Sequence, residues 1–201
     1  PKPFADFLFN SKLYMALETS FGKSVESSFL RQYPIDAKSR WASPPEKLAE
    51  SKALAGLTRE KKAQRRLASV WREIDTSCFF RDVRYLVGIK SGPNTINDTQ
   101  VDAMTKAILI NHGQWLSESK KAHKSLKRIE FILGLTYGTP RTTNNKENQL
   151  LLKLIGNGFK ELDAKRFPGV LANEADTVRV HRQVGLDFWA LIGNPANPTQ
   201  T

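Results

Sequence analysis

The sequence predicts an α/β fold in which a mixed sheet of four or five strands is flanked by helices. Three apolar segments have the length of strands, namely Tyr85–Ile89, Ile129–Tyr137 and Val178–His181. Amphipathic helical patterns lie between these segments and before them. With 201 residues, 40% of them hydrophobic, the chain can bury a substantial core. We therefore expect one domain over residues 1–193 and a loose tail over residues 194–201.

Two helical regions are expected before the first strand. Over Pro3–Tyr33, apolar residues recur at four-residue spacing and form a single stripe. Ser43–Glu46 reads as a capping box with proline in the first turn, so a second helix should begin there. We expect this helix to continue to Leu54, to pause near Gly56 and to resume at Thr58.

The first expected strand is Ser69–Thr76, and it carries two acidic residues. Because strand side chains alternate between faces, Trp71, Glu73 and Asp75 would share one face. The carboxylates of Glu73 and Asp75 would then lie side by side.

The second expected strand is Tyr85–Ile89, and Lys90 follows it directly. An antiparallel hairpin connected through Phe79–Arg84 would bring Lys90 near Asp75. Carboxylate oxygens are ligands for Mg²⁺, and a nearby cation can orient and deprotonate an attacking water; phosphodiester hydrolysis needs both. The alternative is that these charges only keep an exposed strand edge soluble.

Helices and strands are expected to alternate after Lys90. A helix should start within Asn94–Asn97 and end near Gly113, with the basic, partly helical segment Glu118–Arg128 behind it. Ile129–Tyr137 is a nearly continuous apolar run, as expected for a buried central strand. The remaining expected elements are a helix over Gln149–Asp163 with a glycine-rich break, the strand Val178–His181 and a closing helix over Leu186–Ile192.

The charge of the chain favours a polyanionic partner. Lysine and arginine outnumber aspartate and glutamate by 31 to 20, a net charge of +11, and nucleic acid is the commonest partner of such proteins. An anionic membrane surface would also attract this charge, but the sequence has no apolar run of about 18 residues, so no membrane partner is expected. The basic run Arg59–Arg66 is typical of a solvated helix face, and it could also lie along a DNA backbone, adding affinity rather than sequence choice.

Cysteine and histidine usage excludes other classes of site. The single cysteine, Cys78, cannot form an internal disulfide, which fits a reducing cytoplasm. The three histidines have no zinc-like spacing, and the sequence has no glycine fingerprint for ATP or NAD.

An alternative class is a basic protein that docks acidic partners. This would explain the charge, but it would not explain why an acidic pair, a lysine and Gly92-Pro93 follow one another in this order.

Five stretches of the sequence resemble a known family. They are Phe21-Gly22-Lys23 with Glu26, Glu73-Ile74-Asp75, Gly88–Asn97, Phe131–Gly138 and Val178–Ile192. Together they resemble type II restriction endonucleases of the PD-(D/E)XK superfamily, and more narrowly the TdeIII/PmeII-like group, which cuts palindromes of the GGNCC type. The resemblance implies a restriction-endonuclease-like core, double-stranded DNA as substrate and Mg²⁺ as cofactor. A palindrome is two-fold symmetric, so a homodimer is also expected.

The resemblance also assigns roles at the predicted hairpin. Asp75 would bind the metal together with the main-chain carbonyl of Ile89, and Lys90 would act on the water. The family motif has an acid two residues before the lysine, where this chain has Gly88. Either another acid replaces it, with Glu73 as the first candidate and Glu26 as the second, or the protein binds DNA without cutting it.

Polar residues around this hairpin are candidates for contacts with DNA. Gln100, one turn into the expected helix, could reach the scissile region. Free N–H groups at a helix start attract phosphate, so Ser91, Asn94, Thr95 and Asn97 are candidates for contacts with the DNA backbone. Their alternative role is ordinary helix capping. Lys23 would point toward the phosphates. The polar loop 141–147 supplies candidates for base recognition, or is an ordinary surface loop; the candidates are Arg141, Asn144, Asn145 and Lys146.

Overall fold

The computed structural model describes residues 40–90, 92, 96–139 and 145–193, with isolated positions at Ser20 and Ser24. The side chain of Asn145 is also outside the described part. Most of the expected first helix, Pro3–Tyr33, and the expected tail over 194–201 therefore lie outside it.

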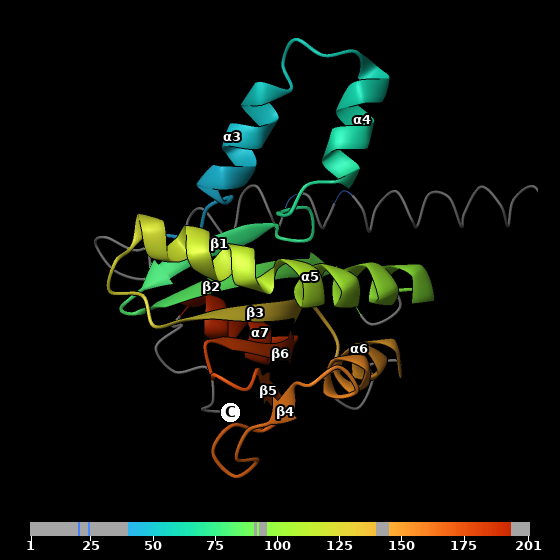
Figure 1. The fold of residues 1–201 in the computed structure, drawn as a ribbon. Helices are drawn as coiled ribbons and strands as arrows, with labels where there is room; N and C mark the ends of the chain where they lie inside the picture. Colours follow the sequence, from blue (N-terminus) through green and yellow to red (C-terminus); the bar gives the residue numbers. More distant parts are fainter. Residues whose placement is uncertain are drawn as a thin grey trace, which may run out of the picture.

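The chain forms an α/β fold around a mixed six-stranded sheet, in the order β1-β2-β3-β6-β5-β4 (Figure 1). The predicted α/β class and mixed sheet are confirmed. Strand β2 pairs parallel with β3, and β3 with β6, while the other pairs are antiparallel. Two short strands, β4 and β5, extend the sheet beyond the number expected. The strands are β1 (Thr76–Phe80), β2 (Val83–Lys90), β3 (Arg128–Leu135), β4 (Lys160–Glu161), β5 (Val170–Ala172) and β6 (Val178–Val184).

Five helices accompany the sheet in the described part of the chain. Helix α5 (Asp98–Ala122) lies across one face, and α7 (Leu186–Gly193) covers the other (Figure 1). Helix α6 (Asn145–Ile155) packs beside α5. Helices α3 (Pro45–Ala53) and α4 (Arg59–Leu67) stand away from the sheet beyond β1 and form a separate projection, which we call the arm (Figure 1).

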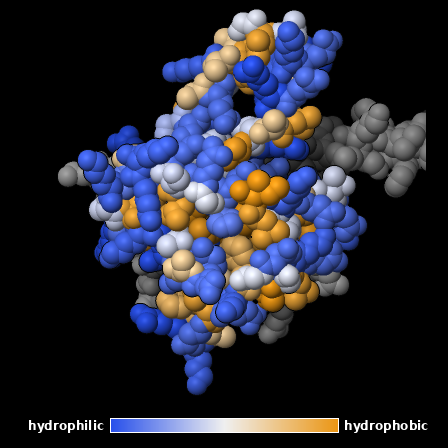
Figure 2. Space-filling view, viewed as in Figure 1, coloured by the Kyte–Doolittle hydropathy of each residue, from blue (hydrophilic) through white to orange (hydrophobic). Residues whose placement is uncertain are grey.

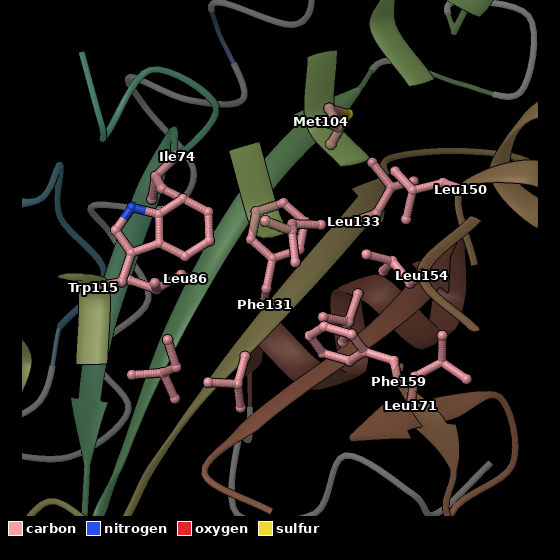
Figure 3. Packing of buried hydrophobic residues seen from close by; sticks show 14 of the residues in the cluster. Ile74, Leu86, Met104, Trp115, Phe131, Leu133, Leu150, Leu154, Phe159 and Leu171 are labelled. Carbon is pink, nitrogen blue, oxygen red and sulfur yellow. The ribbon is translucent and has the colours of Figure 1, made fainter. Parts of the chain in front are cut away.

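The core has two layers because the central strands bury both faces. On the α5 face, Leu86 and Phe131 pack with Met104 and Trp115 (Figure 3). The ring of Trp115 stacks on that of Phe131 with centroids 5.8 Å apart. On the opposite face, alternate residues of β2 and β3 pack against Phe188 of α7. The expected buried central strand is thus β3, and Phe188 of the expected closing helix packs in the core.

The prediction of a strand over Ser69–Thr76 is wrong in its position. Residues 70–73 form a turn in which the Ile74 N–H donates to the Trp71 carbonyl at 3.1 Å, and the strand begins only at Thr76. Trp71 and Ile74 are both buried, which is a three-residue spacing rather than an alternation. The Trp71 ring lies 6.3 Å from Trp115, so packing against α5 curls this segment. The antiparallel hairpin itself is confirmed, with Thr76 opposite Val87.

Two predicted helix boundaries are also wrong. Helix α5 passes through Gly113 and ends at Ala122, because the buried Trp115 and Ser119 hold its second half against the sheet. A glycine within a helix costs only about 1 kcal/mol, which this burial offsets. Helix α6 starts at Asn145, inside the predicted recognition loop, and ends at Ile155, before the strand β4.

The predicted helix start at Ser43–Glu46 is confirmed, but the predicted capping box does not form. Pro44 is the N-cap and no side chain caps the helix. Glu46 instead binds the guanidinium of Arg84, with both oxygens 2.8 Å from its nitrogens. Arg84 is fully buried, and a buried cation needs an anionic partner more than a helix end needs a cap.

Candidate active site

The backbone of the hairpin fixes Asp75 beside the end of β2. The N–H of Asp75 donates to the carbonyl of Val87 at 2.8 Å, and its carboxylate accepts the N–H of Ile89 at 2.7 Å. The side chain is 21% exposed, so solvent still reaches it. Asp75 therefore lies close to the end of β2, as predicted, although it precedes β1 instead of lying within a strand.

The surroundings of Asp75 disfavour an unaccompanied negative charge. Burial raises the pKa of this carboxyl, and the nearby charge of Glu73 raises it further. The Ile89 N–H, Lys90 and Lys47 act in the opposite direction, but the net pKa lies above the ordinary value. A divalent cation beside Asp75 would favour its ionised form.

Lys90 ends β2 on the face that carries α5. Side chains alternate along β2, so Lys90 shares its face with Gly88 and with the buried Leu86. Its carbonyl accepts the N–H of Thr136 at 3.0 Å, which joins the end of β2 to the segment after β3. Lys90 is partly exposed, and its charge acts on the Asp75 carboxyl. The structure thus brings together the acid and the lysine that the sequence singled out.

Glu73 lies in the turn before Asp75 and not on a strand. Its side chain is 14% exposed and forms an ion pair with Arg72 at 3.3 Å. The expectation that Trp71, Glu73 and Asp75 share a strand face is wrong, because Trp71 is buried in the core while both acids remain partly exposed. Glu73 is nevertheless close enough to Asp75 for its charge to affect that carboxyl.

The position of the missing motif acid is closely packed. A Cβ atom on Gly88 would lie 2.8 Å from the carbonyl oxygen of Glu73, 3.4 Å from Met104 and 3.5 Å from Phe131. The turn that carries Glu73 crosses β2 at this point, and only a residue without a side chain leaves room for it. Glycine at position 88 is therefore a packing requirement of this hairpin.

Lys47 is a residue of the site that the sequence analysis missed. It lies on α3, and its Nζ donates to the carbonyl of Ile74 at 2.5 Å and lies 4.0 Å from the Asp75 carboxylate. Nothing in the local sequence distinguishes it from other helical lysines. Its contact with the hairpin depends on how α3 is placed by the Glu46–Arg84 pair.

Glu147, in the first turn of α6, is an acid that the sequence analysis did not single out. It lies on the same helix face as Leu150 and Leu154 and is fully buried. Burial raises the pKa of its carboxyl, while Arg182 acts against this shift. Among the described residues, neither carboxylate oxygen has a hydrogen-bond partner.

Three of the predicted DNA-contact residues have other contacts here. Asn97 caps α5 by accepting the Gln100 N–H at 2.9 Å, and Gln100 accepts the Asn97 N–H at 3.2 Å, so both take the capping role. Lys146 forms an ion pair with Asp98. Asn145 begins α6. The other predicted site residues lie outside the described part of the chain, namely Lys23, Glu26, Ser91, Asn94, Thr95, Arg141 and Asn144.

The residues around Asp75 fit a hard cation. Asp75, Glu73 and the carbonyl of Ile89 offer oxygen donors, the type that Mg²⁺ prefers, and Mg²⁺ usually keeps several water ligands when bound by one or two carboxylates. The described residues contain no cluster of three or more histidine, cysteine or acidic side chains arranged to hold a metal. The site would therefore complete its coordination with water and substrate oxygens.

Within the residues that the structure describes, no helix has both the length and the apolar character needed to cross a membrane.

The fold and this site define a class of protein. The mixed α/β sheet carries at its edge a hairpin that brings an acidic residue near a lysine, and these are groups that phosphodiester hydrolysis can use. The sequence profile of the family described as type II restriction endonuclease EcoO109I matches residues 53–166, more than half of the chain, and the chain belongs to this family. It is thereby a type II site-specific deoxyribonuclease that acts on double-stranded DNA. The chain has no match among curated proteins.

Proposed function

We propose that the protein hydrolyses both strands of a short palindromic DNA site in a Mg²⁺-dependent reaction centred on Asp75 and Lys90. The observation that supports this most directly is the position of the Asp75 carboxylate. It is bound by the Ile89 N–H and is influenced by the cations of Lys90 and Lys47. The match to the restriction endonuclease family includes this hairpin.

Each residue of the hairpin has a part in the proposed reaction. When bound, Mg²⁺ would polarise the phosphoryl group. Asp75 would hold the cation, with the Ile89 carbonyl and either Glu73 or Glu26 as further oxygen donors. Lys90 would orient the attacking water and stabilise the negative charge that develops on the phosphate. In-line attack would invert the configuration at phosphorus, with the 3′ oxygen as the leaving group and a 5′ phosphate left on the product.

The finer assignments come from the sequence resemblance. A target of the GGNCC type and the TdeIII/PmeII-like group within the PD-(D/E)XK superfamily are part of the proposal. A homodimer is proposed because a two-fold symmetric protein matches a two-fold symmetric site. The chain has a single cysteine, Cys78, so it cannot form a disulfide within the chain, which supports a cytoplasmic location.

The proposal is tested by cleavage of phage or plasmid DNA. The purified protein is incubated with DNA and Mg²⁺, beside Lys90→Ala and beside a reaction without metal. Discrete fragments that are absent from both controls are expected, and mapping their ends gives the target and the cut position. If the protein shifts duplex DNA in a gel but never cuts it, the proposal is wrong. Gly88 would then mark a scaffold that binds DNA without a working metal site.

A further inference from the structure

Within the described part of the chain, the arm formed by α3 and α4 is held mainly at its base, by Glu46 and Lys47. The structure describes every residue of both helices, and neither helix buries a side chain. Each helix has nine residues, fewer than an isolated helix needs to be stable in water. Two exposed helices of this kind are expected to gain stability from a binding partner.

The charge of α4 indicates the chemistry of that partner. Its nine residues, Arg59–Leu67, contain five cations and one acid. Lys61 and Arg65, and likewise Lys62 and Arg66, are four residues apart, so like charges are neighbours on the helix surface and repel each other. Hydrophilic side chains cover much of the arm in the view of Figure 2. A polyanion along α4 would relieve this repulsion.

A cleft of about 620 Å³ lies at the arm; its exposed lining is mostly apolar, and four of its lining residues are cations. Lys47, Arg65, Arg66 and Arg72 contribute to its walls, and the acid among its lining residues is Glu50. Glu50 already accepts a hydrogen bond from the Ser69 hydroxyl. Four cations and one acid line the cleft; Lys47 and Arg72 lie beside Asp75 and Glu73, so Arg65 and Arg66 supply the positive charge that is complementary to the phosphates of DNA.

The cleft is connected to the proposed catalytic centre. Lys47 both lines the cleft and lies 4.0 Å from the Asp75 carboxylate. Arg72, which also lines the cleft, forms an ion pair with Glu73. The arm is fixed at its base by the pair of Glu46 with the buried Arg84. A phosphate held in the cleft would thus lie beside the residues that act on the scissile phosphate.

We propose that the arm clamps the sugar-phosphate backbone of duplex DNA, with the strand to be cut seated in the cleft lined by Arg65, Arg66 and Arg72. The inference rests on the proposed function in one respect: that the strand seated in the cleft is the strand cleaved beside Asp75. The contacts are to phosphates, so the arm contributes affinity and register but not sequence choice.

The test measures how binding depends on salt. Affinity for a short labelled duplex of mixed sequence, in EDTA so that nothing is cut, is measured over a series of salt concentrations. The variant Lys61→Gln/Arg65→Gln/Arg66→Gln removes three charges from α4. Each lost phosphate contact lowers the slope of log affinity against log salt by about 0.9, so a decrease of up to about 2.7 is expected.

A matched control removes three charges from the other edge of the sheet. Lys160, Lys165 and Arg166 are exposed and lie on or near β4, whereas the arm lies beyond β1 (Figure 1). Changing these three to glutamine should leave the slope unchanged, as should the charge-conserving variant Arg65→Lys/Arg66→Lys. An unchanged slope in the α4 variant, or an equal decrease in the control, overturns the inference.

The outcome is separable from that of the proposed function. Circular dichroism is used to check that the α4 variant is folded. We expect it to fold, because α4 buries no side chain. Asp75→Asn should bind with the wild-type salt slope while losing cleavage. If Asp75→Asn still cuts DNA, the proposed catalytic centre is wrong, whereas the arm is judged by the salt slope alone.

Discussion

The carbonyl oxygen of Glu73 lies 2.8 Å from the point where a Cβ atom on Gly88 would stand. Gly88→Ala therefore requires the turn or the strand to move, and we expect it to destabilise the fold by about 1–3 kcal/mol. Urea unfolding measures this. Gly113→Ala in α5 is the control, because a Cβ there meets no atom within 4 Å and should raise stability by up to about 1 kcal/mol. A Gly88→Ala protein as stable as the wild type would contradict the packing account.

Lys47 is expected to be a positioning residue for Asp75. Lys47→Met removes the donor to the Ile74 carbonyl and a cation near the carboxylate, so we expect the single-turnover cleavage rate to fall about 10–100-fold, as when outer-shell partners of a metal site are lost. Lys52→Met, exposed on the same helix, should cut normally. Lys47→Arg should restore part of the rate. If Lys52→Met and Lys47→Arg both cut at the same rate as Lys47→Met, this role is excluded.

The buried Arg84 and the partly exposed Glu46 should be strongly coupled. The Arg84 guanidinium also donates to the Ser119 hydroxyl at 2.9 Å and lies over the rings of Trp71 and Phe79. Arg84→Met should cost about 1.5–3 kcal/mol of unfolding free energy, because Glu46 loses its charged hydrogen-bond partner but stays partly exposed to water. In the double variant Arg84→Met/Glu46→Gln the loss should be smaller than the sum of the single losses. Additive losses in thermal or urea unfolding would argue against coupling.

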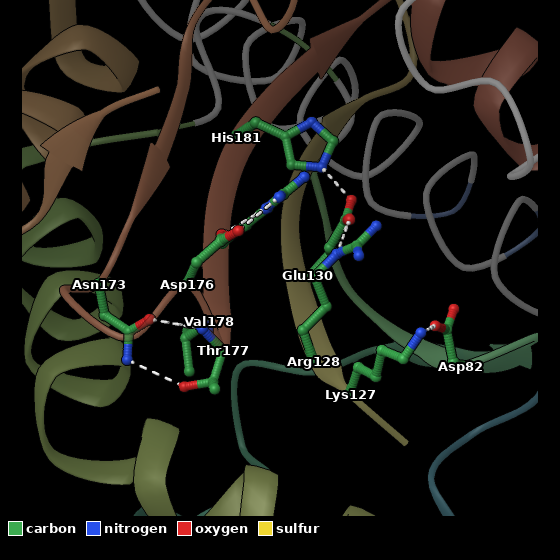
Figure 4. A network of polar contacts seen from close by, with 10 residues as sticks. Asp82, Lys127, Arg128, Glu130, Asn173, Asp176, Thr177, Val178 and His181 are labelled. Atoms are coloured by element: carbon green, nitrogen blue, oxygen red, sulfur yellow. Dashed lines mark hydrogen bonds and ion pairs between the residues drawn. The ribbon is translucent and has the colours of Figure 1, made fainter. Parts of the chain in front are cut away.

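Glu130 should make the protein sensitive to acid. Burial raises its pKa, but His181, 3.4 Å away, and Arg128, at 2.9 Å, outweigh burial and bring the pKa below the ordinary 4.5 (Figure 4). A depressed folded-state pKa stabilises the protein above the unfolded-state value, and this stability is lost as the pH falls through the folded-state value. Glu130→Gln should therefore cost about 2 kcal/mol at neutral pH. The difference in unfolding free energy between Glu130→Gln and the wild type should shrink below about pH 4.5. A difference that stays constant with pH would refute the assignment.

The sequence predicted the parts of the fold that depend on local patterns. Continuous apolar runs identified β2 and β3, and the residues that close and open helices identified α3 and α4 with their break near Gly56. The approach of Lys90 to Asp75 followed from a hairpin within one short stretch of the chain. These features need no knowledge of distant residues.

The remaining features depend on contacts between distant segments. The turn before Asp75 forms because Trp71 packs against Trp115 on α5, and α5 passes Gly113 for the same reason. Lys47 joins the site only because α3 is held by the buried Arg84. Burial of the charged residues Arg84 and Glu147 contradicts what composition alone predicts, since such residues are almost never fully buried unless paired.

The exposed state of the arm also bears on how the protein opens and how its sequence can vary. Since α3 and α4 bury no side chain, their backbone amides should exchange hydrogen through local opening, at far lower free energy than the amides of the buried strand β3. The dense basic residues of α4 should then be an early site of tryptic cleavage, while the sheet stays intact. Substitutions in this helix should have little effect on folding. Selection on its sequence should therefore act mainly through binding.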